Sequence, residues 1–100
     1  MTEQLFQLIL GEDGFIVSLR CNNKFDENKY CDIKNILLTL VSEWQHQEAI
    51  PKKAMLAISE LVECLVGGNR FLDEIEAVKL EDASIEIRDI LNNLYEDLEP

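Results

Sequence analysis

Residues 50–68 read IPKKAMLAISELVECLVGG and contain both ends of one predicted helix. Pro51 suits the first turn of a helix, where its missing N–H costs nothing. Gly67 and Gly68 can adopt the positive φ that ends a helix. The apolar residues between these ends recur at helical spacing and form one stripe: Met55, Ile58, Leu61, Val62 and Leu65. We expect this helix to be the central packing element of the fold.

The residues before this stretch predict a second amphipathic helix, which starts after the polar segment 22–28 and ends before Pro51. Asp26 or Asn28 could cap its start, because a short polar side chain can accept a hydrogen bond from the first turn. The buried stripe expected for it consists of Ile33, Ile36, Leu37, Leu40, Val41 and Trp44. Their spacing follows one face of a helix with 3.6 residues per turn.

The N-terminal segment allows two interpretations. Residues 2–10 and 15–21 are apolar and flank the turn sequence Gly11-Glu12-Asp13-Gly14. They could form two short helices or the arms of a β-hairpin, since the arms are short and the loop has hairpin length. We favour helices, because the rest of the chain is helical in pattern and an isolated two-stranded hairpin is only marginally stable.

The C-terminal third predicts two further helices with a joint at residues 80–83. The first would be capped by Asn69 and bury Phe71, Leu72, Ile75 and Val78. The second would run over 84–98 and bury Ile87, Ile90, Leu91, Leu94 and Leu98. Residues 1–100 are therefore expected to form a single all-α domain, a compact bundle or helical-hairpin stack of five to six helices. An N-terminal β-hairpin followed by helices is the minor alternative.

Composition excludes several classes of protein. The sequence has no run of 18 or more apolar residues, so no membrane span is expected. Residues 1–4 lack the basic region of a signal peptide, which favours a cytoplasmic location. The cysteines, Cys21, Cys31 and Cys64, are odd in number and irregularly spaced. They are typical of reduced thiols rather than of a disulfide framework.

Catalytic and metal-binding patterns are missing from the sequence. His46 is the only histidine, so a pair of Glu-x-x-His motifs, as di-metal helical bundles require, cannot be assembled. A nucleophilic triad would depend on the same His46, and no serine has the glycine context of a nucleophile elbow. The cysteines lack the spacing of a zinc site. We therefore expect no catalytic residues, no metal and no cofactor, and a protein that is not an enzyme.

Charge is the strongest compositional signal. The formal net charge is -11, with 20 acidic and 9 basic residues. Residues 71–100 hold ten acidic and two basic side chains, so this third carries eight of the eleven net negative charges. Such a field repels nucleic acid and anionic membranes and attracts a basic partner. The simpler interpretation, that acidity only keeps a small protein in solution, stays open at this point.

In size, acidity and helical pattern the whole chain resembles the small immunity proteins of bacterial toxin systems, especially those of contact-dependent growth inhibition. The resemblance implies a cytoplasmic antitoxin that binds one cognate toxin domain. Toxins of this kind are often basic nucleases, and their inhibitors commonly cover the active site or a substrate-binding surface. The resemblance assigns no individual functional residues to this chain.

The charge asymmetry indicates which residues would face such a partner. We expect the partner-binding surface to consist of Glu74, Glu76, Glu81, Asp82, Glu86, Asp89, Tyr95, Glu96 and Asp97, with Tyr95 as a possible anchor among the acids. The alternative function is a small helical adaptor or regulatory subunit that acts through protein–protein contacts or self-association. Its apolar contact surface would come from the N-terminal segment, residues 5–19.

Overall fold

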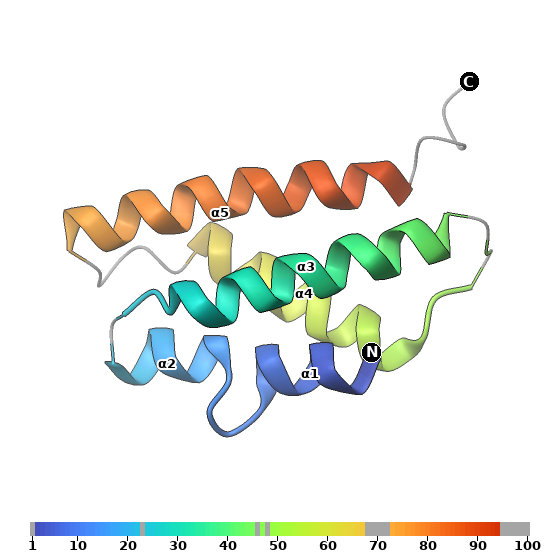
Figure 1. Ribbon diagram of the computed structural model, residues 1–100. Coiled ribbons are helices and arrows are strands. Elements are labelled where there is room, and N and C mark those ends of the chain that lie inside the picture. Colours follow the sequence, from blue (N-terminus) through green and yellow to red (C-terminus); the bar gives the residue numbers. More distant parts are fainter. Residues whose placement is uncertain (1, 23, 46, 48, 68–72, 95–100) are drawn as a thin grey trace.

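The computed structural model describes residues 2–22, 24–45, 47, 49–67 and 73–94. Within these residues all regular structure is helical and there is no strand, which confirms the all-α class. The helices are α1 (Thr2–Leu10), α2 (Phe15–Asn22), α3 (Glu27–Trp44), α4 (Lys52–Gly67) and α5 (Glu74–Asn92) (Figure 1). The N-terminal segment thus forms two short helices and not the alternative hairpin.

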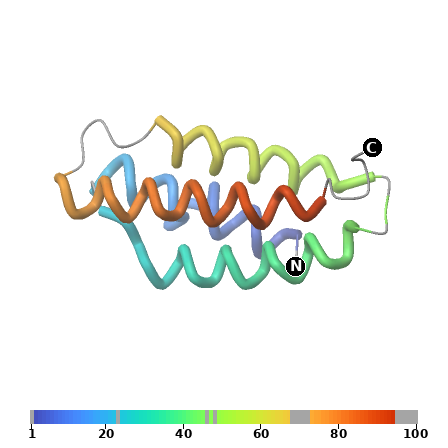
Figure 2. The backbone as a smooth tube through the Cα atoms, turned by 90° about the horizontal axis from the view of Figure 1, so that it is seen from above, coloured from blue at the N-terminus to red at the C-terminus, as the bar shows by residue number. Residues whose placement is uncertain are grey.

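The helices form a bundle with four sides. The short helices α1 and α2 together occupy one side, and α3, α4 and α5 supply the other three (Figures 1 and 2). Helix α1 packs against α3 and α4, and α5 packs against the same two helices from the opposite side. Helix α4 is therefore one wall of the bundle. Helices α3 and α4 each contact both α1 and α5 and each bury six residues, so α4 shares the expected central packing role with α3.

A single helix, α5, replaces the two helices predicted for the C-terminal third, so the described residues do not reach the upper count of six. The predicted joint lies inside α5, where Leu80 and Ala83 are buried in the core. Residues 74–92 contain neither proline nor glycine, so nothing in the sequence interrupts the helix. Asp73 caps its start by accepting a hydrogen bond of 2.8 Å from the Glu76 N–H.

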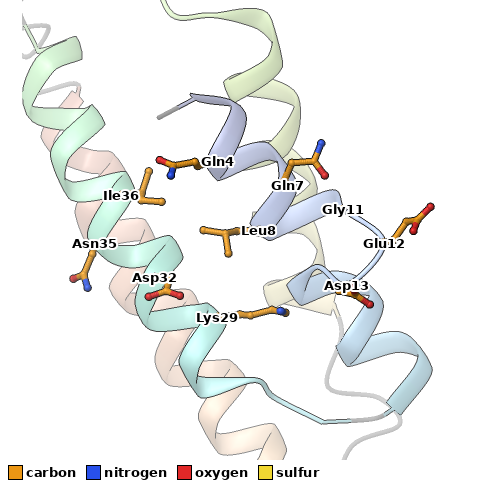
Figure 3. Close-up of a pocket in the computed structure, with 10 residues that line it drawn as sticks. All are labelled: Gln4, Gln7, Leu8, Gly11, Glu12, Asp13, Lys29, Asp32, Asn35 and Ile36. Atoms are coloured by element: carbon orange, nitrogen blue, oxygen red, sulfur yellow. The ribbon is translucent and has the colours of Figure 1, made fainter.

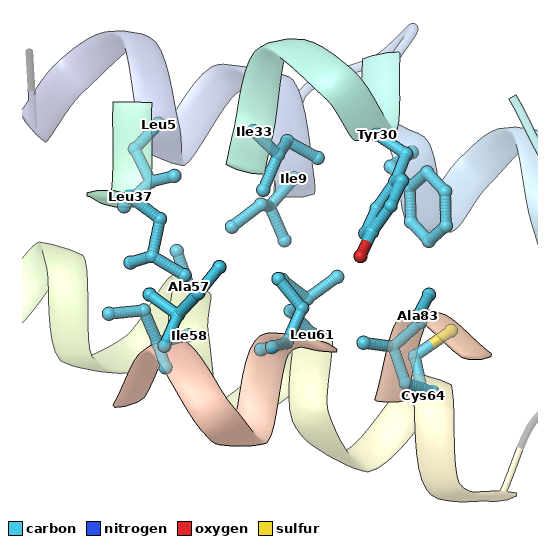
Figure 4. Close-up of a cluster of buried hydrophobic side chains, with 14 of the residues drawn as sticks. Leu5, Ile9, Tyr30, Ile33, Leu37, Ala57, Ile58, Leu61, Cys64 and Ala83 are labelled. Atoms are coloured by element: carbon cyan, nitrogen blue, oxygen red, sulfur yellow. The ribbon is translucent and has the colours of Figure 1, made fainter. Parts of the chain in front are cut away.

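The core is a single cluster to which every helix contributes. Its largest fully buried side chains are Leu5, Ile9, Phe15, Ile33, Leu37, Leu61, Leu80 and Ile87. Figure 4 labels five of them, Leu5, Ile9, Ile33, Leu37 and Leu61. The predicted stripe of α3 is confirmed, with Ile36 half-buried at its edge. At the end of the bundle formed by α2, Phe25 packs edge-on against Phe15 with 5.2 Å between ring centroids, and Tyr30 packs against both rings.

The buried face of α4 is rotated from the predicted stripe. Ile58, Leu61 and Leu65 are buried as expected, but Met55 is exposed and Val62 only half-buried. The remaining buried positions are occupied by small residues: Ala54, Ala57 and Cys64. Small side chains allow neighbouring helices to approach closely, and α1 packs against this wall. The predicted stripe followed large apolar side chains and so missed the alanines that face the core.

In the turn between α1 and α2, backbone atoms lie so close to Gly11 and Gly14 that a side chain would not fit. The Gly11 N–H donates to the Gln7 carbonyl and the Gly14 N–H donates to the Gly11 carbonyl, both at 2.9 Å. A Cβ on Gly14 would lie 2.8 Å from the Ile9 carbonyl oxygen and 2.9 Å from the Gly11 nitrogen. These are backbone atoms, so they cannot move away without displacing the turn.

Gly14→Ala should therefore destabilise the fold by about 1–3 kcal/mol, the usual cost of an overpacked site. Gly67→Ala is the matched control, because a Cβ there meets no atom within 4 Å. The control should be neutral or stabilising by up to about 1 kcal/mol, since alanine favours the helix that Gly67 ends. Urea unfolding followed by circular dichroism measures both changes. Equal stability of the two variants would contradict the close approach at Gly14.

Candidate partner-binding surface

Helix α5 carries the described members of the predicted surface: Glu74, Glu76, Glu81, Asp82, Glu86 and Asp89. The other three predicted residues, Tyr95, Glu96 and Asp97, lie outside the described residues. The six acids do not share one environment. Helix α5 presents Leu80, Ala83, Ile87 and Ile90 to the core, and this orientation decides which carboxylates reach the solvent.

Glu76 has a structural role, because its carboxylate binds groups within the protein. Its Oε2 accepts a hydrogen bond of 2.8 Å from the Phe25 N–H, and its side chain is only 16% exposed. Its Oε1 lies 3.6 Å from the Lys79 ammonium, one helical turn further along α5. The carboxylate therefore ties the start of α5 to the segment between α2 and α3. It has little surface left for a partner, although the sequence placed it among the partner-binding acids.

Glu86 forms an ion pair with another helix and is also partly exposed to solvent. Its Oε2 lies 3.1 Å from the Lys34 ammonium of α3, and its side chain is 46% exposed. An ion pair this exposed typically contributes about 0–1 kcal/mol to stability. Because Lys34 already neutralises much of its charge, Glu86 is a weaker attractor for a basic partner than an unpaired acid would be.

Four acids of α5 are exposed and form no ion pair with any described residue: Glu74, Glu81, Asp82 and Asp89. We call these four residues the acidic face. The nearby Lys79 does not neutralise it, because this lysine is bound to Glu27 at 3.0 Å and to Glu76. The hydrogen bond to Glu27 raises the pKa of Lys79, so this lysine stays charged and paired at neutral pH.

Large apolar side chains lie on the same side of α5 as the acidic face. Ile75, Val78 and Ile85 are 69%, 50% and 60% exposed, respectively. Their spacing with the acids is regular, because 75, 78, 82, 85 and 89 follow one another in steps of three and four residues. Residues at that spacing share one side of a helix. We call Ile75, Val78, Asp82, Ile85 and Asp89 the outer seam.

The prediction that Ile75 and Val78 are buried is wrong. The true core positions on α5, Leu80 and Ala83, precede Ile87 and Ile90 at helical spacing. That series contains an alanine and was divided by the joint predicted at 80–83. A search for the longest unbroken helical series would have found it, and would have shown that Ile75 and Val78 lie opposite to it.

The pockets of the described residues include two grooves between packed helices. The first, between α1 and α3, is open and lined by Gln4, Gln7, Leu8, Gly11, Glu12, Asp13, Lys29, Asp32, Asn35 and Ile36 (Figure 3). The second lies between α4 and α5, holds about 200 Å³ and is lined mostly by apolar side chains: Val62, Leu65, Val66, Ser84, Ile87, Arg88, Leu91 and Asn92. The second groove borders the outer seam through Arg88 and Asn92, which follow Ile85 and Asp89 at a spacing of three residues.

Metal and membrane sites are not found in the described part of the chain. Its Cys, Asp and Glu side chains form no cluster of three that could hold a metal ion. None of its helices is both long and apolar enough to span a membrane. The three cysteines are free thiols, of which Cys64 is buried and both Cys21 and Cys31 are exposed. Burial raises the pKa of the Cys64 thiol, so this sulfur stays protonated and unreactive at neutral pH.

Tyr30 places a polar atom in the core near Glu86. Its side chain is 6% exposed, and its hydroxyl has no hydrogen-bond partner among the described residues. The Lys34 ammonium lies 5.6 Å from the centre of the ring. Burial, and then the negative charge of Glu86, raise the pKa of Tyr30 above its ordinary value. The hydroxyl therefore stays neutral in the folded protein under conditions that ionise an exposed tyrosine.

Removing the carboxylate of Glu76 tests its structural role. Glu76→Ala leaves the Phe25 N–H without its acceptor, which should lower the free energy of unfolding by about 1–3 kcal/mol. Glu74→Ala is the control, because Glu74 is an exposed acid of the same helical turn, and it should change stability by less than about 0.5 kcal/mol. Urea denaturation of both variants measures the difference. Indistinguishable midpoints would show that the bond to Phe25 contributes nothing.

Tyr30→Phe tests the buried hydroxyl. Near pH 8 the variant should be as stable as the original chain or slightly more so, within about 1 kcal/mol, because an unpartnered polar atom is removed. The raised pKa of Tyr30 means that the unfolded chain loses this proton first, above about pH 10, so stability falls as pH rises beyond that value. The variant should lose about 1.4 kcal/mol less per pH unit there, measured by urea unfolding. An unchanged alkaline slope would contradict the raised pKa.

Comparison with known proteins adds no relative to these observations. The chain matches no protein-family model, no curated protein and no solved structure. A function for this chain must therefore follow from its own surface: the charge, the exposure and the spacing of the side chains on α5.

Proposed function

We propose that this protein is a cytoplasmic immunity protein, an antitoxin that binds and neutralises a basic, nuclease-type toxin domain. The observation that carries the proposal is the acidic face, four exposed carboxylates on one helix of a chain with a net charge of -11. In this proposal the protein acts by binding and has no catalytic role of its own.

The chemistry of a nuclease makes it a suitable partner. Its substrate-binding surface presents lysine and arginine side chains at the positions where phosphates bind. Carboxylates can accept charge-assisted hydrogen bonds from these groups and so occupy the place of the phosphates. Opposite charges on the two proteins also accelerate their encounter, particularly at low salt. The acidic face meets these requirements because its carboxylates are exposed and form no ion pair with any described basic residue.

Burial of the N-terminal segment argues against the alternative function, an adaptor that self-associates through this segment. Leu5, Ile9, Phe15, Ile16 and Leu19 of that segment are buried in the core. They are therefore unavailable as an apolar contact surface. Exposed apolar residues occur on α2, α3 and α4 as well, but the set on α5, Ile75, Val78 and Ile85, lies among carboxylates that would repel a second copy of the same face.

The decisive experiment is an affinity capture from the native host with three versions of the protein. These are the original chain, Asp82→Lys/Asp89→Lys in the acidic face, and Glu43→Lys/Glu63→Lys on exposed positions of α3 and α4. Each double variant replaces two acids by lysines, so both change the net charge equally. Any difference in partner binding between the two variants therefore depends on where the substituted charges lie and not on the net charge. Circular dichroism should show both variants folded, because exposed substitutions usually change stability by less than about 0.5 kcal/mol.

The original chain and the α3–α4 variant should capture one stoichiometric basic protein and inhibit its nuclease activity. Binding by the acidic-face variant should be at least roughly tenfold weaker, about 1.4 kcal/mol. Binding by the original chain should weaken as salt rises, because the attraction between exposed charges is screened. Capture of a neutral or acidic partner would contradict the proposal, as would equal binding by all three versions at low salt.

A further inference from the structure

The outer seam of α5 combines two chemical properties that the acidic face alone does not explain. Three of its five residues, Ile75, Val78 and Ile85, are large aliphatic side chains exposed by half or more. Solvated charge would suffice for solubility and for electrostatic attraction. Exposed aliphatic side chains scattered singly are ordinary, but here they recur on one side of one helix together with Asp82 and Asp89.

The spacing of the seam matches the contact line between two helices. Steps of three and four residues place side chains along the seam at which one helix packs lengthwise on another. Helix α5 has 19 residues, which corresponds to about 28 Å of helix. Its outer side faces away from α3 and α4, on the far side of the bundle from α1 and α2 (Figures 1 and 2). A second helix could therefore lie along it without displacing any described element.

Charge decides what kind of helix fits. Glu74 and Glu81 of the acidic face flank the seam on one side, and Asp82 and Asp89 lie within it. A helix laid on this seam must place apolar side chains against Ile75, Val78 and Ile85 and basic ones against the two aspartates. A second copy of α5 would bring the same carboxylates together, and like charges facing each other are unfavourable. An anionic membrane or a nucleic acid is repelled by the same field.

We infer that the outer seam of α5 is the docking site for an amphipathic helix of the partner, with apolar residues at three- and four-residue spacing and lysine or arginine between them. This inference rests on the proposed function in one respect, that the partner is basic. It adds the kind of structural element that docks and the apolar contacts that retain it. The groove between α4 and α5 lies beside the seam and offers a socket of about 200 Å³ for one larger apolar side chain.

A peptide display experiment tests the docking site without knowledge of the partner. The library consists of helical peptides of about 20 residues, with aliphatic residues at heptad spacing and a mixture of Lys, Glu and Gln between them. The complete chain is the bait. Selected peptides are then measured by fluorescence anisotropy against the original chain and two variants. The seam variant is Val78→Ser/Ile85→Ser, and the control is Val17→Ser/Leu56→Ser, which alters exposed aliphatic residues of α2 and α4.

Selection should enrich lysine over glutamate between the aliphatic positions. The selected peptides should bind the seam variant at least about tenfold more weakly than the original chain, because apolar contacts at the centre of an interface carry much of its affinity. The control should bind within about twofold of the original chain, as expected for residues outside the contact. Absence of enrichment, enrichment of acidic peptides, or equal binding to the seam variant would overturn the inference.

The same seam variant separates this inference from the proposed function when it is used in the affinity capture. If the captured nuclease depends on Asp82 and Asp89 but binds the seam variant normally, the proposed function stands and the helix-docking inference fails. If basic helical peptides require the seam while the captured partner is not a nuclease, the docking site stands and the antitoxin proposal fails. Loss of nuclease binding in both variants supports the two together.

Discussion

The burial of one stripe of α5 determines the orientation of every other side chain on that helix. Leu80, Ala83, Ile87 and Ile90 close the fourth side of the core. A helix can present only one side to a core, so the residues opposite this stripe must face the solvent. Ile75, Val78 and Ile85 are exposed for this reason and not because the core lacks room. The acidic face and the outer seam are both consequences of this single packing choice.

The start of α5 is where this orientation is fixed. Asp73 caps the helix, and Glu76 reaches across to the Phe25 N–H in the segment that leads into α3. Lys79 adds an ion pair to Glu27 at the first turn of α3. Phe25 in turn packs in the cluster with Phe15 and Tyr30. Rotation of α5 about its axis would break these contacts, so the direction in which the outer seam points is anchored by bonds far from its centre.

Ion pairs between neighbouring helices use up basic side chains and so leave other acids on the surface unpaired. Lys34, Lys53 and Lys79 each bind an acid on a neighbouring helix: Glu86, Glu3 and Glu27. The hydrogen bond from Lys53 lowers the pKa of Glu3, so this pair keeps its charges as pH falls below the usual range for glutamate. Basic side chains used in this way cannot neutralise the acids of the acidic face. The net charge of -11 is therefore not spread evenly over the surface, and part of it is concentrated on the acidic face.

The sequence predicted those parts of the fold in which large apolar residues alone define the buried side. Helix α3 is the clearest case, because Ile33, Leu37, Leu40, Val41 and Trp44 leave only one possible inward face. The prediction failed on α4 and α5, where alanines occupy core positions and large aliphatic residues are exposed. Periodicity of hydrophobic size cannot distinguish these cases, since both sides of α5 contain isoleucine. The role of Glu76 was equally hidden, because its partner is a backbone N–H about fifty residues away in sequence.

The combination of acids and aliphatic residues on one helix assigns different tasks to the two kinds of side chain in the proposed complex. Exposed charges act over several ångströms and mainly raise the rate of encounter, while desolvated apolar contacts mainly slow dissociation. A surface with carboxylates alone would attract any basic protein and release it quickly in physiological salt. A surface with isoleucines alone would bind apolar helices without regard to charge. The outer seam, in which Ile75, Val78 and Ile85 share one side of α5 with Asp82 and Asp89, requires a partner with apolar and basic side chains at a fixed spacing. A partner without basic side chains would desolvate the aspartates without replacing their hydrogen bonds to water, and one without apolar side chains would leave the aliphatic residues without contacts.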